Sequence, residues 1–239
     1  MFERKSFDPN IEHGSKKLLF AHIQALFDFM ALRNLDTFEV PRAVGYVDDP
    51  ERFCWWLVFN FPSEPTAPQL APSPLSQQPL TLLRLLQSVF KSHPALEKRF
   101  AIAADICTTL HQLFSSSWMH KSIRSDNILF PESSGPTPPR ARLTSLLVCG
   151  FEYSRLETEV ETIDRSRTGK PVSVAMYRHP NYQGEAAQGY RVQYDVYSLG
   201  LVLLEIGLWA SLFRLFDLGL RGRRHLQRPD LRLSLYGNT

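Results

Sequence analysis

A short segment, residues 120–130 (HKSIRSDNILF), concentrates polar side chains that could do chemistry. The Arg124 guanidinium can bind an anion, and the Asn127 amide oxygen can act as a ligand. The Ser122 hydroxyl is far too weakly basic to accept a proton at neutral pH. His120 stands on an otherwise apolar turn, which is more typical of a packed structural histidine than of a catalytic one. Taken alone, these residues can bind an anion but cannot drive group transfer.

Other common kinds of site find no support in the sequence. The three cysteines (Cys54, Cys107 and Cys149) are odd in number, widely spaced and without a C-x-x-C pair, so they indicate neither a disulfide framework nor a zinc site. Cysteine usage of this kind predicts a reducing, cytoplasmic compartment. The twelve glycines contain no G-x-G, so no glycine-rich phosphate loop is expected.

Length and composition are those of a soluble globular protein. The chain has 239 residues, of which 44% are hydrophobic and 21% charged, enough for one large domain or two small ones. The net charge of +3 divides into +4 in residues 214–239, which hold six arginines, and −1 in the remainder. A basic tail can bind nucleic acid or acidic lipid, but this one has no interleaved aromatic residues to stack on bases, and a solvated tail is favoured.

Membrane and export signals are weak. The first ten residues, MFERKSFDPN, carry charges where a signal peptide needs an apolar stretch. The most apolar window, residues 197–216, is long enough to cross a bilayer but contains Glu205 and Arg214, which are costly at membrane depth. No transmembrane segment is expected.

The elements that must position residues 120–130 can be predicted from periodicity. Residues 16–33 show one apolar stripe of an amphipathic helix, with Ser15 as its N-cap. The stripe consists of Leu19, Ile23, Leu26, Phe27 and Met30. Residues 38–47 and 53–61 are β-rich and flank the turn-forming DDPER, which predicts a hairpin. Residues 62–79 contain six prolines and therefore form a linker rather than a helix or a central strand.

The second half is predicted to be mainly helical. Residues 94–114 give the strongest helical pattern, with the stripe Leu96, Phe100, Ala103, Cys107, Leu110 and Phe114. Residues 131–140 form a second proline-rich break between two strand candidates, and 156–170 an exposed loop that contains Ser166 and Thr168, ordinary candidates for phosphorylation. Residues 195–213 are hydrophobic nearly all round, which predicts a helix buried at the centre of the fold.

Three segments, in order, resemble the large lobe of protein kinases: 120–130, CGFEYSR (149–155) and YDVYSLGLVLLEIGLW (194–209). The family's catalytic loop reads H-R-D-L-x-x-x-N, and His120 and Asn127 stand at its ends while Ser122 takes the place of the aspartate. Asp195 resembles the residue at the start of the buried helix that anchors this loop. A helix N-cap is the alternative role for Asp195, and the pattern favours the anchor.

The small lobe is only partly represented. Lys5 stands where the family has its phosphate-pairing lysine, although a solvated surface lysine is the plainer interpretation. Helix 16–33 has no glutamate to pair with it, and Gln24 is the nearest polar candidate. The segments are similar to those of fungal kinase-like proteins in which such a region follows a prion-inhibition and propagation (HeLo) domain.

The resemblance implies an α+β, protein-kinase-like two-lobed fold truncated at both ends. The small lobe lacks its first strands, and the large lobe is mainly helical and lacks its last helices. The implied organisation is a partial small lobe at 1–61, a linker at 62–79, a partial large lobe at 80–213 and a basic tail at 214–239.

The resemblance also assigns roles to the candidate site. Ser122 is the replaced base and Arg124 a retained cation, while Lys5 and Asn127 are the remaining nucleotide-binding positions. Gly150 stands in place of the metal-binding aspartate, and Glu152 could be proposed as a displaced ligand, although that position normally needs glycine's backbone freedom. His120, Phe151 and Asp195 are structural. ATP therefore stays a candidate ligand, and the loss of carboxylates argues against magnesium.

The expected function is that of a pseudokinase acting as an intracellular interaction or switch module with a protein partner. The alternatives are an active ATP-dependent Ser/Thr kinase with divergent residues, and a nucleic-acid or membrane binder acting through its basic tail. Nothing in the sequence identifies the partner or an upstream domain.

Overall fold

The computed structural model describes residues 1–32, 39–60, 80–88, 93–131, 143, 145–157, 172–182 and 190–217. The fold is a mixed α+β arrangement, as the sequence predicts. The proline-rich segment 62–79, almost all of 131–140, the pair Ser166 and Thr168, and the tail beyond residue 217 lie outside the described residues.

The first part of the chain forms a three-stranded antiparallel sheet. Its order is β1 (Phe2–Ser6), β3 (Cys54–Asn60) and β2 (Arg42–Asp49), so the strand that comes last in sequence lies in the middle. β2 and β3 form the expected hairpin, joined by a 3₁₀ turn at Pro50–Arg52 that Asp49 caps through the Arg52 N–H. β1 was not predicted, and its register sets Lys5 opposite Trp55.

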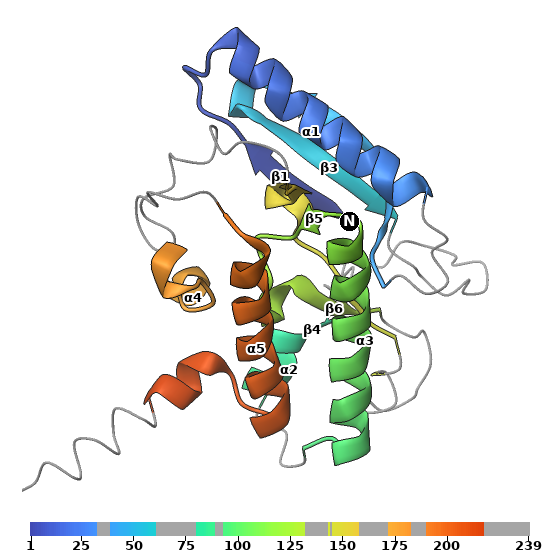
Figure 1. The fold of residues 1–239 in the computed structure, drawn as a ribbon, viewed down its shortest axis with the longest axis vertical. Helices are drawn as coiled ribbons and strands as arrows, with labels where there is room; N and C mark the ends of the chain where they lie inside the picture. Colours follow the sequence, from blue (N-terminus) through green and yellow to red (C-terminus); the bar gives the residue numbers. More distant parts are fainter. Residues whose placement is uncertain are drawn as a thin grey trace, which may run out of the picture.

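Helix α1 (His13–Leu32) covers one face of this sheet (Figure 1). Its buried residues are Leu19, Ile23, Leu26 and Met30, which follow the predicted stripe. The proposed cap was wrong: the helix begins at His13, and the Lys16 N–H already bonds to the Glu12 carbonyl, so Ser15 lies inside the first turn.

Two long helices, α3 (Leu96–Ser115) and α5 (Val192–Leu208), run side by side in the lower part of the molecule (Figure 1). They are fastened where α3 begins and α5 ends, because Arg99 donates a hydrogen bond of 2.9 Å to the Gly207 carbonyl. The buried face of α3 differs from the predicted one. It carries Ile102, Ile106, Leu110 and Leu113, whereas Phe100 is 67% exposed.

Short elements between these helices hold the polar loop. β4 (Leu80–Thr81) leads into α2 (Leu82–Gln87) and pairs with β6 (Ile128–Phe130), which pairs in turn with β7 (Leu147–Val148). β5 (Trp118–Met119) pairs with β8 (Arg155–Leu156). The remaining short elements are α4 (Val172–Ala175) and 3₁₀ turns at Ser125–Asn127, Phe151–Tyr153 and Pro180–Tyr182.

One hydrophobic core joins the sheet to the helices, running from Leu19 on α1 through Leu82 and Ile106 to Leu212. The composition of α5 predicts a helix that is buried on all sides, and this prediction is wrong. Val196, Leu204 and Leu208 are exposed on one side, and the helix ends at Trp209 in the left-handed conformation. None of the helices in the described residues combines the length and apolar character needed to cross a bilayer.

Candidate polar loop site

The loop between β5 and β6, residues 120–127, is held in place by a buried carboxylate from α5. Asp195 accepts a hydrogen bond from the His120 N–H at 2.7 Å and another from the Lys121 N–H at 2.9 Å. Asp195 lies in the first turn of α5, four residues after the N-cap Arg191. Of its two sequence-based roles, the observed contacts are those of the anchor, and not those of a helix cap.

The hydrogen bonds to Asp195 stabilise a strained backbone conformation at Lys121. Lys121 has φ of 63°, a left-handed conformation that a side chain with a Cβ rarely adopts. The Asp195 carboxylate also accepts the Tyr190 hydroxyl at 2.6 Å. Burial nevertheless raises the pKa of Asp195 to about 6, and the hydrogen bonds from Tyr190, His120 and Lys121 offset this only in part. At neutral pH Asp195 is thus largely ionised and able to hold all three donors.

His120 is a structural side chain. It is fully buried, and its ring lies 4.7 Å from that of Phe151. Burial, assisted by the nearby Arg124 charge, lowers the pKa of His120 to about 3, so the ring is neutral over the physiological range and a poor base. Its Nδ1 accepts the Ser122 N–H at 3.3 Å, which makes the turn compact. His120 therefore shapes the loop and takes no part in proton transfer.

The Asn127 side chain is bonded within the loop. Its amide nitrogen donates to the Ser122 carbonyl at 2.8 Å and to the Ser122 hydroxyl at 3.1 Å, and its amide oxygen accepts from the Arg124 guanidinium at 3.3 Å. Arg124 also forms an ion pair of 2.7 Å with Asp126. The oxygen that could act as a metal ligand therefore faces a cation, which disfavours a second positive charge there.

Gly150 lies directly against this amide. Its φ is 90°, and a Cβ built on it would overlap the Asn127 side chain. Only glycine fits, both because of the backbone conformation and because of the space. An aspartate at position 150 would need Asn127 to move away, so the arrangement leaves no room for a metal-binding carboxylate at this point.

Glu3, a residue that the sequence analysis did not single out, connects the small sheet to the site through its carboxylate. Glu3 on β1 accepts the Gly150 N–H at 2.7 Å through one oxygen and the Phe151 N–H at 2.8 Å through the other. Burial and the neighbouring Glu152 charge raise the pKa of Glu3 to about 7, despite these amide bonds and the Arg124 charge. Glu3 thus links the small sheet to the turn at 150–151.

Lys5 is buried on the same strand. It is only 6% exposed, which corrects the interpretation of a solvated surface lysine, and its ammonium lies 5.1 Å from the centre of the Tyr153 ring. Gln24, its candidate partner on α1, lies on the exposed side of that helix. Glu152 is half-buried beside Glu3.

A second buried network ties the loop to the segment 172–182. The hydroxyls of Ser125 and Tyr177 share a hydrogen bond of 2.8 Å, and the Tyr177 hydroxyl donates to Glu205 on α5 at 2.8 Å. Glu205 also accepts the Leu212 N–H at 2.6 Å. Glu205, one of the two charged residues in the apolar window of the sequence, is therefore fully buried and hydrogen-bonded in the structure.

The site brings together Ser122, Arg124, Asn127 and Gly150, and Glu3 on β1 bonds to the Gly150 N–H. Lys5, on the same strand, lies beside Tyr153. Sequence reasoning missed Glu3 and Tyr177, whose partners lie far away along the chain, and treated Glu205 only as a charge within an apolar window. Among the described residues, no three His, Cys, Asp or Glu side chains gather as metal ligands. The described side chains do not fit a magnesium–nucleotide complex, because Asn127 is turned toward Arg124 and Glu3 occupies the amides at 150–151.

A comparison of the chain with protein-family models finds no match, and a comparison with curated protein sequences finds none either.

Proposed function

We propose that the chain is a kinase-like domain without phosphotransfer activity, which acts as an interaction or switch module. The support for kinase-like character is architectural. A small antiparallel sheet of order β1-β3-β2 carries one helix, and a lower helical part presents a polar loop anchored by a carboxylate from a central helix. The packing of His120 on Phe151 accords with the structural roles that the resemblance implies for both.

The lack of activity rests on one observation, the contact between Asn127 and Gly150. Phosphoryl transfer depends on positioning and on charge neutralisation by metal-bound carboxylates and a base. Here the base position is Ser122, whose hydroxyl accepts a hydrogen bond from Asn127, and the carboxylate position is a glycine with no room for a side chain. Neither task can be performed by the groups present.

The thiols agree with the proposed cytoplasmic setting. Cys54, Cys107 and Cys149 are all free, and burial raises the pKa of Cys107 and Cys149, which lowers the fraction of thiolate at these two residues. We place the module and its protein partner in a reducing compartment on this basis.

A thermal-shift titration tests the proposal. A ligand that binds only the folded state raises Tm by mass action. We expect magnesium to add nothing to any effect of ATP or ADP on Tm, and Asn127→Ala to respond to the nucleotides as the wild type does. A rise in Tm that requires ATP and magnesium together, and that disappears in Asn127→Ala and Lys5→Met, would favour the active-kinase alternative.

A further inference from the structure

Helix α5 presents an outer face that carries no charge. Its two charged residues, Asp195 and Glu205, are both fully buried. The exposed residues of the helix are Gln193, Val196, Tyr197, Gly200, Leu204, Gly207 and Leu208. A helix that borders on water normally places charged and polar side chains on its outer face. The outer face of α5 therefore has the composition of a surface that another molecule covers.

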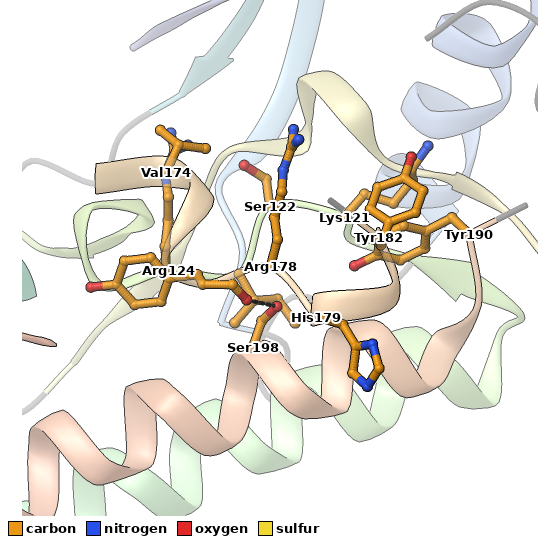
Figure 2. Close-up of a pocket in the computed structure, with 11 residues that line it drawn as sticks. Lys121, Ser122, Arg124, Val174, Arg178, His179, Tyr182, Tyr190 and Ser198 are labelled. Atoms are coloured by element: carbon orange, nitrogen blue, oxygen red, sulfur yellow. Dashed lines mark hydrogen bonds between the residues drawn. The ribbon is translucent and has the colours of Figure 1, made fainter. Parts of the chain in front are cut away.

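The other sides of α5 are already occupied. One side belongs to the hydrophobic core, and α3 packs along another. On the side that faces the segment 172–182, the Ser198 hydroxyl donates to the Tyr177 carbonyl at 2.7 Å, as Figure 2 shows. His179 stacks on Tyr194 of the same helix at 4.8 Å. The uncharged face is thus the part of α5 that none of the described elements covers.

Helix α3 extends this face at the end of α5. Arg99 donates to the Gly207 carbonyl at 2.9 Å, and its guanidinium lies 6.0 Å from the centre of the Trp209 ring. These contacts hold the beginning of α3 beside the end of α5 (Figure 1). Leu96 and Phe100 lie one helical turn apart in this part of α3, and they are 57% and 67% exposed. The apolar surface therefore continues from one helix to the other.

The exposed area is close to what a dimer requires. We call the surface the α3–α5 face and define it by Leu96, Phe100, Val196, Leu204 and Leu208, each of which is about half exposed or more. Together these residues expose on the order of 500 Å² of apolar surface, near the upper limit of about 600 Å² for the largest patch of a typical monomer. Two such faces in contact bury roughly 1,000 Å², the size at which specific protein interfaces begin.

The face on α5 is also complementary to itself. Val196, Gly200, Leu204 and Leu208 follow one another at four-residue spacing and form one row on the helix. When two such rows meet antiparallel about an axis between Gly200 and Leu204, each Leu204 lies over a glycine and each Leu208 over a valine. A Cβ built on Gly200 would meet no atom of a neighbouring element within 4 Å. Glycine lowers the stability of a helix, and no packing within the chain requires it here, whereas the close approach of a second helix does.

We propose that the α3–α5 face joins two copies of the chain in a symmetric dimer, in which the α5 helices pack antiparallel and each Leu204 lies over Gly200 of the partner subunit. Both copies use the same face, as in other twofold interfaces. Burial of apolar surface supplies the affinity, and the uncharged outer face of α5 brings no like charges together. The face shares no residue with the loop 120–127, so the inference does not depend on the function proposed above.

Sedimentation velocity of the full chain over a series of micromolar concentrations tests the inference. We expect the wild type to sediment as a dimer. Leu204→Lys and Leu204→Glu should each raise the dissociation constant of the dimer about tenfold or more, because each places two like charges near the twofold axis in an apolar contact. An equimolar mixture of the two variants should form a heterodimer, because opposite charges then face each other. Neither a membrane nor an unrelated protein partner would give this recovery.

Val44→Lys is the matched control, because it adds the same charge at a valine that is 64% exposed on β2, and it should leave the dimer unchanged. Gly200→Leu should weaken the dimer as strongly as Leu204→Lys does, although a Cβ at position 200 has open space within the chain itself. Circular dichroism of each variant checks that it is folded.

Three results would overturn the inference: a wild type that stays monomeric or forms only larger aggregates, equal effects of Leu204→Lys and Val44→Lys, or a mixture of the two Leu204 variants that does not recover the dimer. Phosphate transfer from ATP by the wild type would instead overturn the proposed function, so the two failures are distinguishable.

Discussion

Asp195 illustrates, at the scale of single residues, how a buried charge shapes the loop. Its carboxylate accepts the backbone N–H groups of His120 and Lys121 and the hydroxyl of Tyr190. Asp195→Ala should lower the free energy of unfolding by about 3 kcal/mol or more, because two buried N–H groups and a strained Lys121 lose their partner. Urea denaturation measures the change.

Tyr190→Phe is the control for this variant, because it removes one of the three donors and leaves the loop backbone bonded. It should cost about half as much as Asp195→Ala. Equal costs for the two variants would mean that the backbone contacts of Asp195 contribute nothing.

The contact between Gly150 and Asn127 predicts a coupled pair. Gly150→Ala should destabilise the fold by about 3 kcal/mol, through the positive φ and through overlap with the Asn127 amide. In the background of Asn127→Ala, which removes that amide, the same change should cost at least 1 kcal/mol less, an interaction of the size that double-mutant cycles resolve, roughly 0.5–3 kcal/mol. Additive costs in denaturation would contradict the contact.

Glu3 gives the structure a pH dependence of defined sign. Its pKa in the folded state, about 7, lies above the ordinary value of 4.5, so the folded chain binds the proton more tightly than the unfolded chain does. The contribution of Glu3 to stability is therefore fully present below pH 4.5 and is lost as the pH rises to about 7.

Glu3→Gln removes this titration. The stability of the variant relative to the wild type should rise between pH 5 and pH 7.5 and level off above, which melting curves across that range measure. The neutral His120, whose pKa is lowered, contributes with the opposite slope to both proteins at acid pH and cancels in the comparison. A difference between the two proteins that does not change with pH would contradict the raised pKa.

The sequence predicted some of these residue contacts and not others for a physical reason. Asp195 heads a strongly apolar helix, a position that by itself suggests a helix cap, and it was the resemblance to the kinase family that suggested its role as the anchor of the loop. Glu3 lies in the charged segment FERKSF, and its partners are amides almost 150 residues away, which have no side-chain signature in the sequence.

At the scale of elements, periodicity located the long helices but not always the face they bury. In α3 two apolar stripes overlap, one through Phe100, Ala103 and Cys107 and the other through Ile102 and Ile106. Packing against α5 and the core buries the second stripe. The buried face of the helix is therefore rotated by about one residue from the face that the sequence predicted. Amphipathic α1 has a single stripe, and its buried face was correctly predicted.

This difference gives a direct test. Ile106→Ala should cost about 2–5 kcal/mol, as for other fully buried large-to-small changes, because Ile106 is 1% exposed. Phe100→Ala should cost about 0.5 kcal/mol or less, because a side chain that is 67% exposed loses little contact. Thermal or urea unfolding of the pair decides between the faces, and the reverse order of costs would support the face that the sequence favoured.

Most of the shortest elements could not be predicted. β4, β5 and β8 have two residues each and exist because a partner strand bonds to them, so no local pattern marks them. β7 is equally short, but β6 and β7 lie in the two strand candidates on either side of the proline-rich break at 131–140. β1 is longer, but its inward positions carry Glu3 and Lys5, which breaks the apolar alternation expected of a half-buried strand. Charged residues that face inward are here a mark of the site.

At the scale of the whole molecule, one core and one polar loop connect the sheet to the helices. The hydrophobic cluster runs from α1 to the segment after α5, and Glu3 adds a polar link between β1 and the turn at 150–151. Under the function proposed above, this arrangement positions the loop 120–127 without the carboxylates that phosphoryl transfer needs.

Phosphate transfer by the full chain tests this account most directly. The assay follows labelled phosphate from ATP, at millimolar ATP and magnesium, to a generic protein substrate and to the chain itself, for the wild type, Ser122→Asp and Asn127→Ala. We predict no transfer above the enzyme-free blank for any of the three, since Ser122→Asp restores a base but leaves the phosphates unneutralised. Wild-type transfer at a kinase-like rate, on the order of 1 per second, that Asn127→Ala abolishes would contradict the account.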